Sequence, residues 1–193
     1  RLFSPWPDLD KVMREKKIPL FALESQEPIR DFDFLGITIG YEMCYTNILQ
    51  VLDLGQIPLH AANRTEADPI VIGGGPCACN PEPLVDFIDL FMLGEGEESM
   101  NELMDLYRDC KAANESKASF LQKAAQIGGI YVPSLYEVTY NEDGTVAQIT
   151  PKDGAPKTVK KRIIRDFDKV FYPENFIVPF MGTVHDRAVV ELL

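Results

Sequence analysis

The sequence predicts an α/β fold in which helices flank a parallel sheet and a β-hairpin follows. Two strand-to-glycine turns support the parallel sheet. The apolar run 69–72 leads into Gly73-Gly74-Gly75-Pro76, and the apolar run 89–93 leads into Gly94-Glu95-Gly96 and then a helix. Strands that end in glycine and give way to helices are typical of parallel α/β sheets, which bind ligands at the carboxyl ends of their strands. Glycine there allows a positive φ or a close approach of the backbone.

A change of pattern at Gly128 predicts the hairpin. Residues 135–140 alternate between apolar and polar side chains, Asn141-Glu142-Asp143-Gly144 forms a turn, and residues 145–150 return. Glycine at the end of such a turn is placed for a positive φ. We therefore expect an α/β domain over residues 1–127 and a hairpin extension over residues 128–180.

The first third of the chain predicts two helices and two strands. Asp8 can cap a helix with apolar residues at helical spacing, and residues 18–23 form a short strand that a proline interrupts. Residues 34–40 are almost continuously apolar, as buried parallel strands are. A helix over 45–54 ends at Gly55, which is a typical stop signal.

The remaining elements follow with clear boundaries. In chain order they are a proline-rich loop over 76–83, a short helix over 84–88, a helix from Glu97, a helix over about 119–126, and strands over 159–164 and 184–193. The helix from Glu97 carries methionines and a tyrosine at helical spacing, and we interpret this stripe as core.

Composition and charge exclude several functions. The 193 residues are 46% hydrophobic and 25% charged, and no apolar run approaches the ~20 residues that span a bilayer. The formal net charge of -11 argues against nucleic acid, because phosphate contacts need a basic surface. A basic cluster over 157–165 is interleaved with apolar residues, and we interpret it as the solvated face of a strand. We expect neither a membrane nor a nucleic-acid partner.

The four cysteines are Cys44, Cys77, Cys79 and Cys110. Their spacing is not that of a secreted disulfide framework, so we expect a reducing cytoplasm. Cys44, Cys77 and Cys79 could form a metal site, but the paired spacings typical of structural zinc are absent. We therefore interpret the cysteines as buried thiols that hold no metal.

The sequence offers no pattern for nucleophilic catalysis. Its two histidines, His60 and His185, lie in separate regions, and neither is near a nucleophile-elbow motif. We interpret both as structural and predict no catalytic residue.

The first glycine turn matches a loose dinucleotide pattern but lacks the physical properties of a phosphate site. The segment Gly73-x-Gly75-x-x-Ala78 has the required glycines. A pyrophosphate site needs those glycines to open directly onto a helix, whose free amides bind the anion. Pro76, Pro81 and Pro83 remove amide donors and break any such helix. No lysine follows the glycines, which also excludes a P-loop.

The second glycine turn is acidic and leaves two interpretations open. Glu95, Glu97 and Glu98 favour the helix dipole but would repel an anion. They either stabilise the helix alone or accept hydrogen bonds from hydroxyl, amide or ammonium groups of a neutral or cationic ligand.

A third group of residues follows the parallel strand 34–40. Tyr41, Glu42, Tyr45 and Asn47 lie where parallel sheets bind ligands. They are either packing aromatics and helix-start residues or the lining of a ligand crevice.

Short motifs along the chain carry a resemblance to a known family. They are Phe3-Ser4-Pro5-Trp6, Pro19-Leu20-Phe21-Ala22-Leu23-Glu24-Ser25, Phe32 to Glu42 with Tyr45-Thr46-Asn47-Ile48-Leu49, Gly73-Gly74-Gly75-Pro76 with Asn80-Pro81-Glu82-Pro83, Gly94-Glu95-Gly96-Glu97, Tyr131-Val132-Pro133-Ser134-Leu135-Tyr136, and Val184-His185-Asp186-Arg187. In this order they resemble the N-terminal region of cobalamin-binding-type radical S-adenosylmethionine (radical SAM) proteins, and they span nearly the whole chain.

The resemblance implies a domain organisation. Residues 1–127 would form a flavodoxin-like, cobalamin-binding-domain-like sheet whose first strand lies upstream of Arg1. Residues 181–193 would begin a radical SAM barrel. In that family a Cys-x-x-x-Cys-x-x-Cys motif of the barrel binds a 4Fe-4S cluster and S-adenosylmethionine, and this chain lacks the motif. By resemblance, the full-length protein carries both groups and this chain is not catalytic by itself.

The resemblance also implies a cofactor and partners. The Asp-x-His-x-x-Gly motif that ligates cobalt is absent, so cobalamin would bind without that lower ligand. The residues expected to bind it are Thr38, Tyr41, Glu42, Tyr45, Gly73, Gly74, Gly75, Pro76, Gly94, Glu95 and Gly96. The alternative is a degenerate domain without a cofactor that serves as a docking module. The expected partners are the protein's own barrel and, because a missing strand leaves a sheet edge unpaired, a second copy of the chain.

Overall fold

The structure is a computed structural model that describes residues 5–152 and 154–170. Its centre is a four-stranded sheet in the order β1-β2-β3-β4. The strands are β1 (Phe34–Thr38), β2 (Ile70–Gly74), β3 (Leu90–Met92) and β4 (Ile130–Tyr131). The first three are parallel, and β4 pairs antiparallel with β3. The predicted α/β fold is confirmed and is consistent with a flavodoxin-like sheet, although the sequence did not predict an antiparallel β4.

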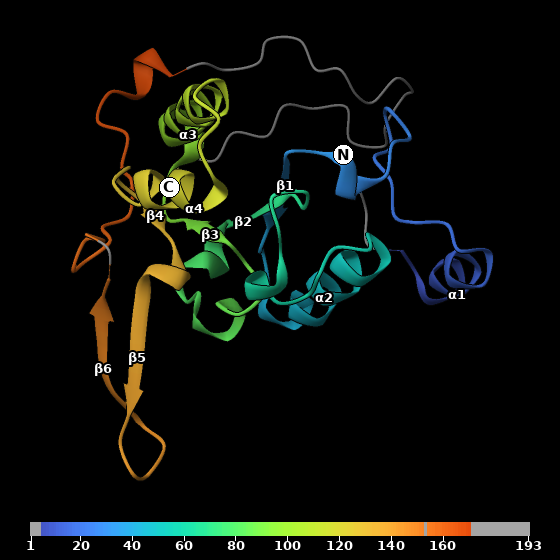
Figure 1. The fold of residues 1–193 in the computed structure, drawn as a ribbon, viewed down its shortest axis with the longest axis horizontal. Coiled ribbons are helices and arrows are strands. Elements are labelled where there is room, and N and C mark those ends of the chain that lie inside the picture. The colour runs from blue at the N-terminus through green and yellow to red at the C-terminus, as the bar shows by residue number, and fades with distance from the viewer. Residues whose placement is uncertain (1–4, 153, 171–193) are drawn as a thin grey trace.

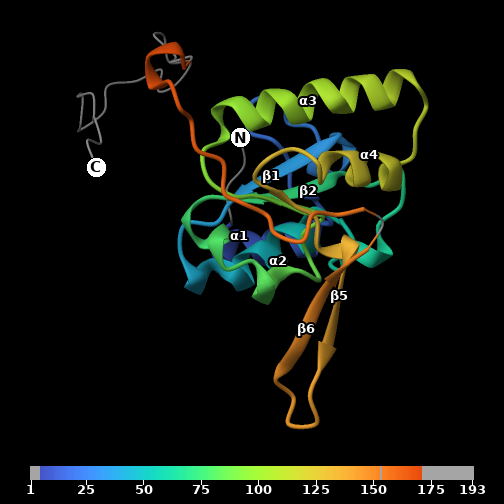
Figure 2. The ribbon, with the colours of Figure 1, turned by 90° about the vertical axis from the view of Figure 1, so that its left-hand side faces the viewer.

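Helices cover both faces of the sheet (Figures 1 and 2). The helices α1 (Pro7–Lys16) and α2 (Tyr45–Leu54) lie on one face, and α3 (Gly96–Ala112) and α4 (Lys117–Ala124) lie on the other. Val71 and Phe91 are buried on the α2 side, whereas Ile72 and Leu90 are buried on the α3 side. Alternate residues of the central strands thus enter opposite cores, which explains their continuously apolar sequences. Within the described residues no helix is long and apolar enough to cross a membrane.

The helix ends follow from local sequence. The bounds predicted for α2 are confirmed, and the Gly55 N–H donates to the Val51 carbonyl at 2.9 Å. At the start of α1, Pro7 occupies the first turn, where its missing N–H costs no intrahelical bond. Trp6 is the N-cap residue of α1, so the predicted cap at Asp8 is wrong by two residues.

The strand β1 is at the edge of the sheet among the described residues. The Ile39 N–H donates to the Gly74 carbonyl at 2.7 Å, so the odd-numbered residues of β1 bond to β2. Peptide groups alternate in direction along a strand, and those of Phe34, Gly36 and Thr38 therefore point away from β2. The outer edge of β1 is thus the open edge of the sheet among the described residues. The expected dimer through this edge stays a prediction.

The strand predicted over residues 18–23 is wrong. In this segment Phe21 forms an isolated antiparallel bridge with Pro28, and the structure assigns no ladder there. Pro19 has no N–H to donate, and the prolines on both partners limit the pairing. The backbone of Leu20 instead donates to the carbonyl of Leu54 at the end of α2.

Two further predicted elements are wrong. The helix expected over 84–88 is a 3-10 helix over Glu82–Leu84 followed by a turn. The strand expected over 159–164 is reduced to one parallel bridge between Arg162 and Gly94. The reason is tertiary: β4 already occupies the sheet position beside β3, so only the end of β3 is free to bond.

The predicted hairpin is confirmed and projects from the body of the molecule (Figure 2). Its strands are β5 (Tyr136–Tyr140) and β6 (Val146–Pro151), which pair antiparallel. Gly144 in the connecting turn has a φ of 83°, as the sequence predicted. The strand expected over 184–193 and the barrel start expected over 181–193 lie outside the described residues.

Candidate functional site

The carboxyl ends of β1 and β2 bring several of the expected site residues together. Thr38 is in register with Gly74, and the turn that contains Gly75 follows directly. Short 3-10 helices over Glu42–Cys44 and Pro76–Cys79 then continue from the two strands. The expected residues of the β1 end and of the first glycine turn therefore share one edge of the sheet.

The first glycine turn packs against the end of β1. Gly75 has a φ of 92°, and a Cβ built there would lie 3.1 Å from the carbonyl oxygen of Ile39 and 3.1 Å from Cγ2 of Thr38. The Cys77 N–H donates to the same Ile39 carbonyl at 3.0 Å. A Cβ on Gly73 would meet the ring of Phe91 at 2.9 Å. Both glycines are thus required by contacts within the fold.

A thiol and a carboxylate meet beside this turn. Burial raises the pKa of the Cys77 thiol, and the adjacent Glu42 carboxylate raises it further. Burial also raises the pKa of Tyr45, with smaller contributions from Cys77 and Glu42. The side chains of Cys44 and Cys79 are exposed and only Cys110 is buried, so the prediction of buried thiols is wrong for Cys44 and Cys79. The difference arises because both lie in 3-10 turns beyond the strand ends.

The second glycine turn is covered by the chain itself. Gly94 has a φ of 93°, and a Cβ there would overlap the carbonyl oxygen of Arg162. The carboxylate of Glu95 accepts a hydrogen bond from the Ile164 N–H, and Gly96 begins α3. The acidic turn therefore does accept hydrogen bonds from an amide, but that amide belongs to a later segment of the same chain.

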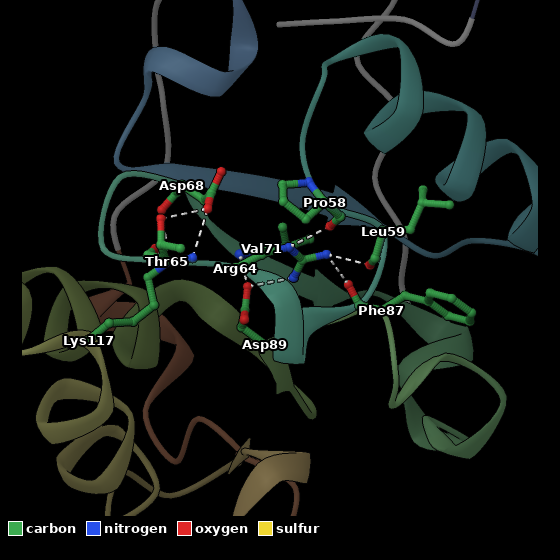
Figure 3. Close-up of polar contacts among 9 residues, drawn as sticks. All are labelled: Pro58, Leu59, Arg64, Thr65, Asp68, Val71, Phe87, Asp89 and Lys117. Atoms are coloured by element: carbon green, nitrogen blue, oxygen red, sulfur yellow. Dashed lines mark hydrogen bonds and ion pairs between the residues drawn. The ribbon is translucent and has the colours of Figure 1, made fainter.

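The structure shows a buried ion pair that the sequence did not reveal (Figure 3). The side chain of Arg64 is fully buried and pairs with that of Asp89, which is 5% exposed, at 2.7 Å. The guanidinium also donates to the carbonyls of Pro58 at 3.0 Å, Leu59 at 2.9 Å and Phe87 at 2.6 Å. Asp89 accepts the Val71 N–H at 2.7 Å. The sequence signal was the position of Asp89 directly before a buried strand. A buried aspartate needs a partner to remain charged.

Lys117 extends this network into the loop before β2. Its Nζ donates to the carbonyls of Thr65 and Asp68, each at 2.8 Å. Burial lowers the pKa of Lys117, and nearby carboxylates oppose that shift. These contacts attach the loop to α4 and to the sheet, and all of them are satisfied within the chain. We interpret the network as structural.

Two cavities lie at the opposite, amino-terminal end of the strands. One of about 1040 Å³ lies between the hairpin and the Arg64–Asp89 pair. The other, of about 540 Å³, is lined by residues that precede β1 and β2, among them Asp33 and Asp68. His60 lines the larger cavity and packs against Phe87 with ring centroids 5.0 Å apart, in agreement with a structural histidine. Neither cavity was predicted, because residues far apart in sequence line them.

Comparison with known proteins identifies the family. A family model of the N-terminal region of radical SAM proteins matches residues 1–133, which is more than half of the chain. The chain belongs to this family. Over 88 residues the chain is 32% identical to the uncharacterized protein MJ0966 of Methanocaldococcus jannaschii. The matched stretch covers 45% of this chain and 18% of that protein. The radical SAM N-terminal domain thus spans less than a fifth of the curated relative, and no solved structure matches it.

The residues of this domain do not fit an iron–sulfur cluster. The four cysteines do not form the Cys-x-x-x-Cys-x-x-Cys motif. In the described part of the chain, no three side chains of histidine, cysteine, aspartate or glutamate are placed to hold a metal ion. At Gly94 the backbone of Arg162 lies where a Cβ would be. At β1, by contrast, Thr38, Tyr41 and Glu42 are exposed.

Proposed function

We propose that this radical SAM N-terminal domain is a non-catalytic docking module that binds the radical SAM barrel of the same protein. One observation carries the proposal: the hairpin exposes an apolar face. The exposed fractions are 65% for Tyr140, 54% for Val146 and 45% for Ile149. Contiguous apolar residues on a projecting element are typical of protein–protein contact surfaces.

The strand register puts these side chains on one face. Val138 pairs with Ile149, and Tyr140 pairs with Val146 across a β-bulge at Ala147, which keeps Val146 and Ile149 on the same face. Successive side chains of a strand point to opposite faces, so Thr139 and its partner Gln148 lie on the other face. One face of the hairpin is therefore aliphatic and aromatic, whereas the other is polar.

Two facts favour the barrel as the occupant of the apolar face. The hairpin directly follows the region that defines the family, which ends at residue 133. The chain also covers only 18% of its relative, so proteins of this kind have much more polypeptide available to cover the face. The domain itself lacks the cysteine motif that binds the 4Fe-4S cluster, which favours a docking role over a catalytic one.

Cysteine labelling of the full-length protein tests the docking proposal. Ile149→Cys places a thiol on the apolar face, and Gln148→Cys places one on the polar face of the same strand. Each variant is treated with a maleimide, and labelling of the hairpin peptide is followed by mass spectrometry. We expect position 148 to label at least about tenfold faster, because an interface residue is removed from solvent. Equal labelling of the two positions would overturn the proposal.

Cobalamin binding is the second candidate, and the exposed β1 end favours it. Thr38, Tyr41 and Glu42 are open to solvent, and a Cβ on Gly40 would meet nothing within 4 Å. Together with the family resemblance, this leaves room for a corrinoid at the edge shared by β1 and β2. In this proposal the contacts lie at β1 and β2, because the backbone of Arg162 lies against Gly94.

Retention of a corrinoid tests this second candidate. The full-length protein is mixed with hydroxocobalamin and passed through a size-exclusion column while corrin absorbance is recorded. We expect co-elution with the native protein and its loss in Gly40→Leu, which fills open space without disturbing the core. The matched control is Gly36→Leu, which lies within β1 and farther from its carboxyl end. Absence of co-eluting absorbance from the native protein would rule out cobalamin.

A further inference from the structure

Residues 160–164, here called the strap, pass the carboxyl end of β3, where Arg162 forms a parallel bridge with Gly94. The Arg162 N–H donates to the Leu93 carbonyl at 2.7 Å, and the Arg162 carbonyl accepts the Glu95 N–H at 3.1 Å. This is the pairing of an added parallel strand, limited to one residue. The strap therefore binds β3 in the way that extended peptides bind a sheet edge.

Two glycines with positive φ make room for the strap. At Gly94 a Cβ would overlap the carbonyl oxygen of Arg162 and lie 2.7 Å from its nitrogen. At Gly129, whose φ is 90°, a Cβ would lie 3.0 Å from the Cβ of Arg162. Side chains at either position would prevent the close approach, so both glycines shape the groove for a peptide backbone.

The side chain of Arg162 is held by α3. Its guanidinium pairs with Glu98 at 2.8 Å and with Glu102 at 2.5 Å, and the arginine side chain is 25% exposed. These carboxylates raise the pKa of Arg162. Glu98 and Glu102 are four residues apart on a helix and therefore lie on one face, where both can reach one guanidinium.

The strap is recognised with a defined register. Ile164 is buried, and its N–H donates to the carboxylate of Glu95. Ile163 between the two inward residues is 59% exposed. Lys160 and Lys161 are exposed as well, so the interpretation of this basic segment as solvated holds for them but not for Arg162. The pattern of inward residues is Arg-x-Ile.

We infer that the carboxyl end of β3, with the first turns of α3, is a binding site for an extended, arginine-bearing segment, and that residues 160–164 occupy it. The carboxylates and glycines of the second turn then have a peptide as their ligand. The strap thus occupies the space against Gly94 that another ligand of this turn would need. This inference does not depend on docking of the hairpin.

Trypsin cleavage of the full-length protein tests the strap. The segment contains cleavage sites at Lys157, Lys160, Lys161, Arg162 and Arg165. A residue bound in a groove is protected, so we expect cleavage after Arg162 to be at least about tenfold slower than after the exposed Lys157. In the double variant Glu98→Gln, Glu102→Gln all sites remain, and cleavage after Arg162 should rise about threefold to tenfold. The glutamates are at the surface, so the fold should tolerate the change.

The control removes two carboxylates from the same helix without touching Arg162. Asp105→Asn with Asp109→Asn should leave cleavage after Arg162 unchanged. Amide hydrogen exchange supplies a second measurement, in which the N–H groups of Arg162 and Ile164 should exchange more slowly than that of Lys161. Native cleavage after Arg162 as fast as after Lys157, or the same effect from both double variants, would overturn the inference.

Discussion

The glycines of this chain differ in what makes each of them necessary. Gly36 has ordinary backbone geometry, and a Cβ there would meet nothing within 4 Å. Gly144 has a φ of 83° but open space around it. Gly94 combines a φ of 93° with direct contact to the backbone of Arg162. Sequence alone could not rank the three, because the contact with Arg162 joins residues far apart in the chain.

Alanine substitutions at these glycines should therefore have graded effects. We expect Gly36→Ala to change the free energy of unfolding by less than ~0.5 kcal/mol. Gly144→Ala should cost about 1 kcal/mol, because an L-residue is disfavoured at positive φ. Gly94→Ala should cost more than ~2 kcal/mol, since it adds displacement of the strap to the same backbone cost. Urea denaturation measures all three, and equal costs at positions 94 and 144 would contradict the account.

The ion pair of Arg64 and Asp89 gives a second prediction at the residue scale. Removing one member leaves a charge and several carbonyls buried without a partner. Arg64→Met should therefore lower the free energy of unfolding by about 3–5 kcal/mol. The matched control is Arg30→Met, because Arg30 is a half-exposed surface arginine whose loss should cost less than ~1 kcal/mol. The result to be compared is the urea midpoint of each variant, and similar midpoints would mean that the buried pair adds little.

At the scale of elements, α3 is attached to the start of β1 by both charge and aromatic contacts. Lys111 pairs with Asp33 at 2.7 Å, and the Tyr107 hydroxyl donates to the same carboxylate at 2.8 Å. The rings of Phe34 and Tyr107 meet edge to face, with centroids 4.5 Å apart. Hydrogen bonds, from Lys111 first and then from Tyr107, lower the pKa of Asp33.

This attachment should weaken in acid. Because the pKa of Asp33 is lower in the folded state, its contribution is present above the unfolded pKa and is lost as the pH falls through the folded pKa. Asp33→Asn should therefore be less stable than the native chain at pH 7, and the difference should shrink between about pH 5 and pH 2. Urea midpoints across that range measure the effect. The control Asp109→Asn, at an exposed position of α3, should follow the native curve in parallel.

The elements also show where prediction from local sequence succeeds. The helix α2 has an apolar face and a glycine stop, and its predicted bounds are confirmed. The segments 18–23 and 159–164 have strand-like sequences but pair at isolated residues. A strand needs a partner as well as a pattern, and β4 already occupies the position beside β3 that the later segment would need.

At the scale of the whole molecule, the two glycine turns serve different parts of one sheet edge. The turn at Gly75 packs against the end of β1, beside the exposed Thr38, Tyr41 and Glu42. The turn at Gly94 holds the strap. The elements proposed for contact with other segments, namely the hairpin and the strap, both follow the region that defines the family. The binding role of the eleven expected residues stays a prediction.

Local sequence was sufficient for the α/β class, the hairpin, the bounds of α2 and the family, because these depend on periodicity, turn residues and short motifs. Tertiary structure alone revealed the antiparallel β4, the Arg64–Asp89 pair and the strap on Gly94. Each of these joins segments that are distant in the sequence, and their pairing depends on which backbone groups and charges remain free after the sheet has formed. For the same reason, the ligand of the acidic second turn could be described in advance by its chemistry but not recognised as a later part of the same chain.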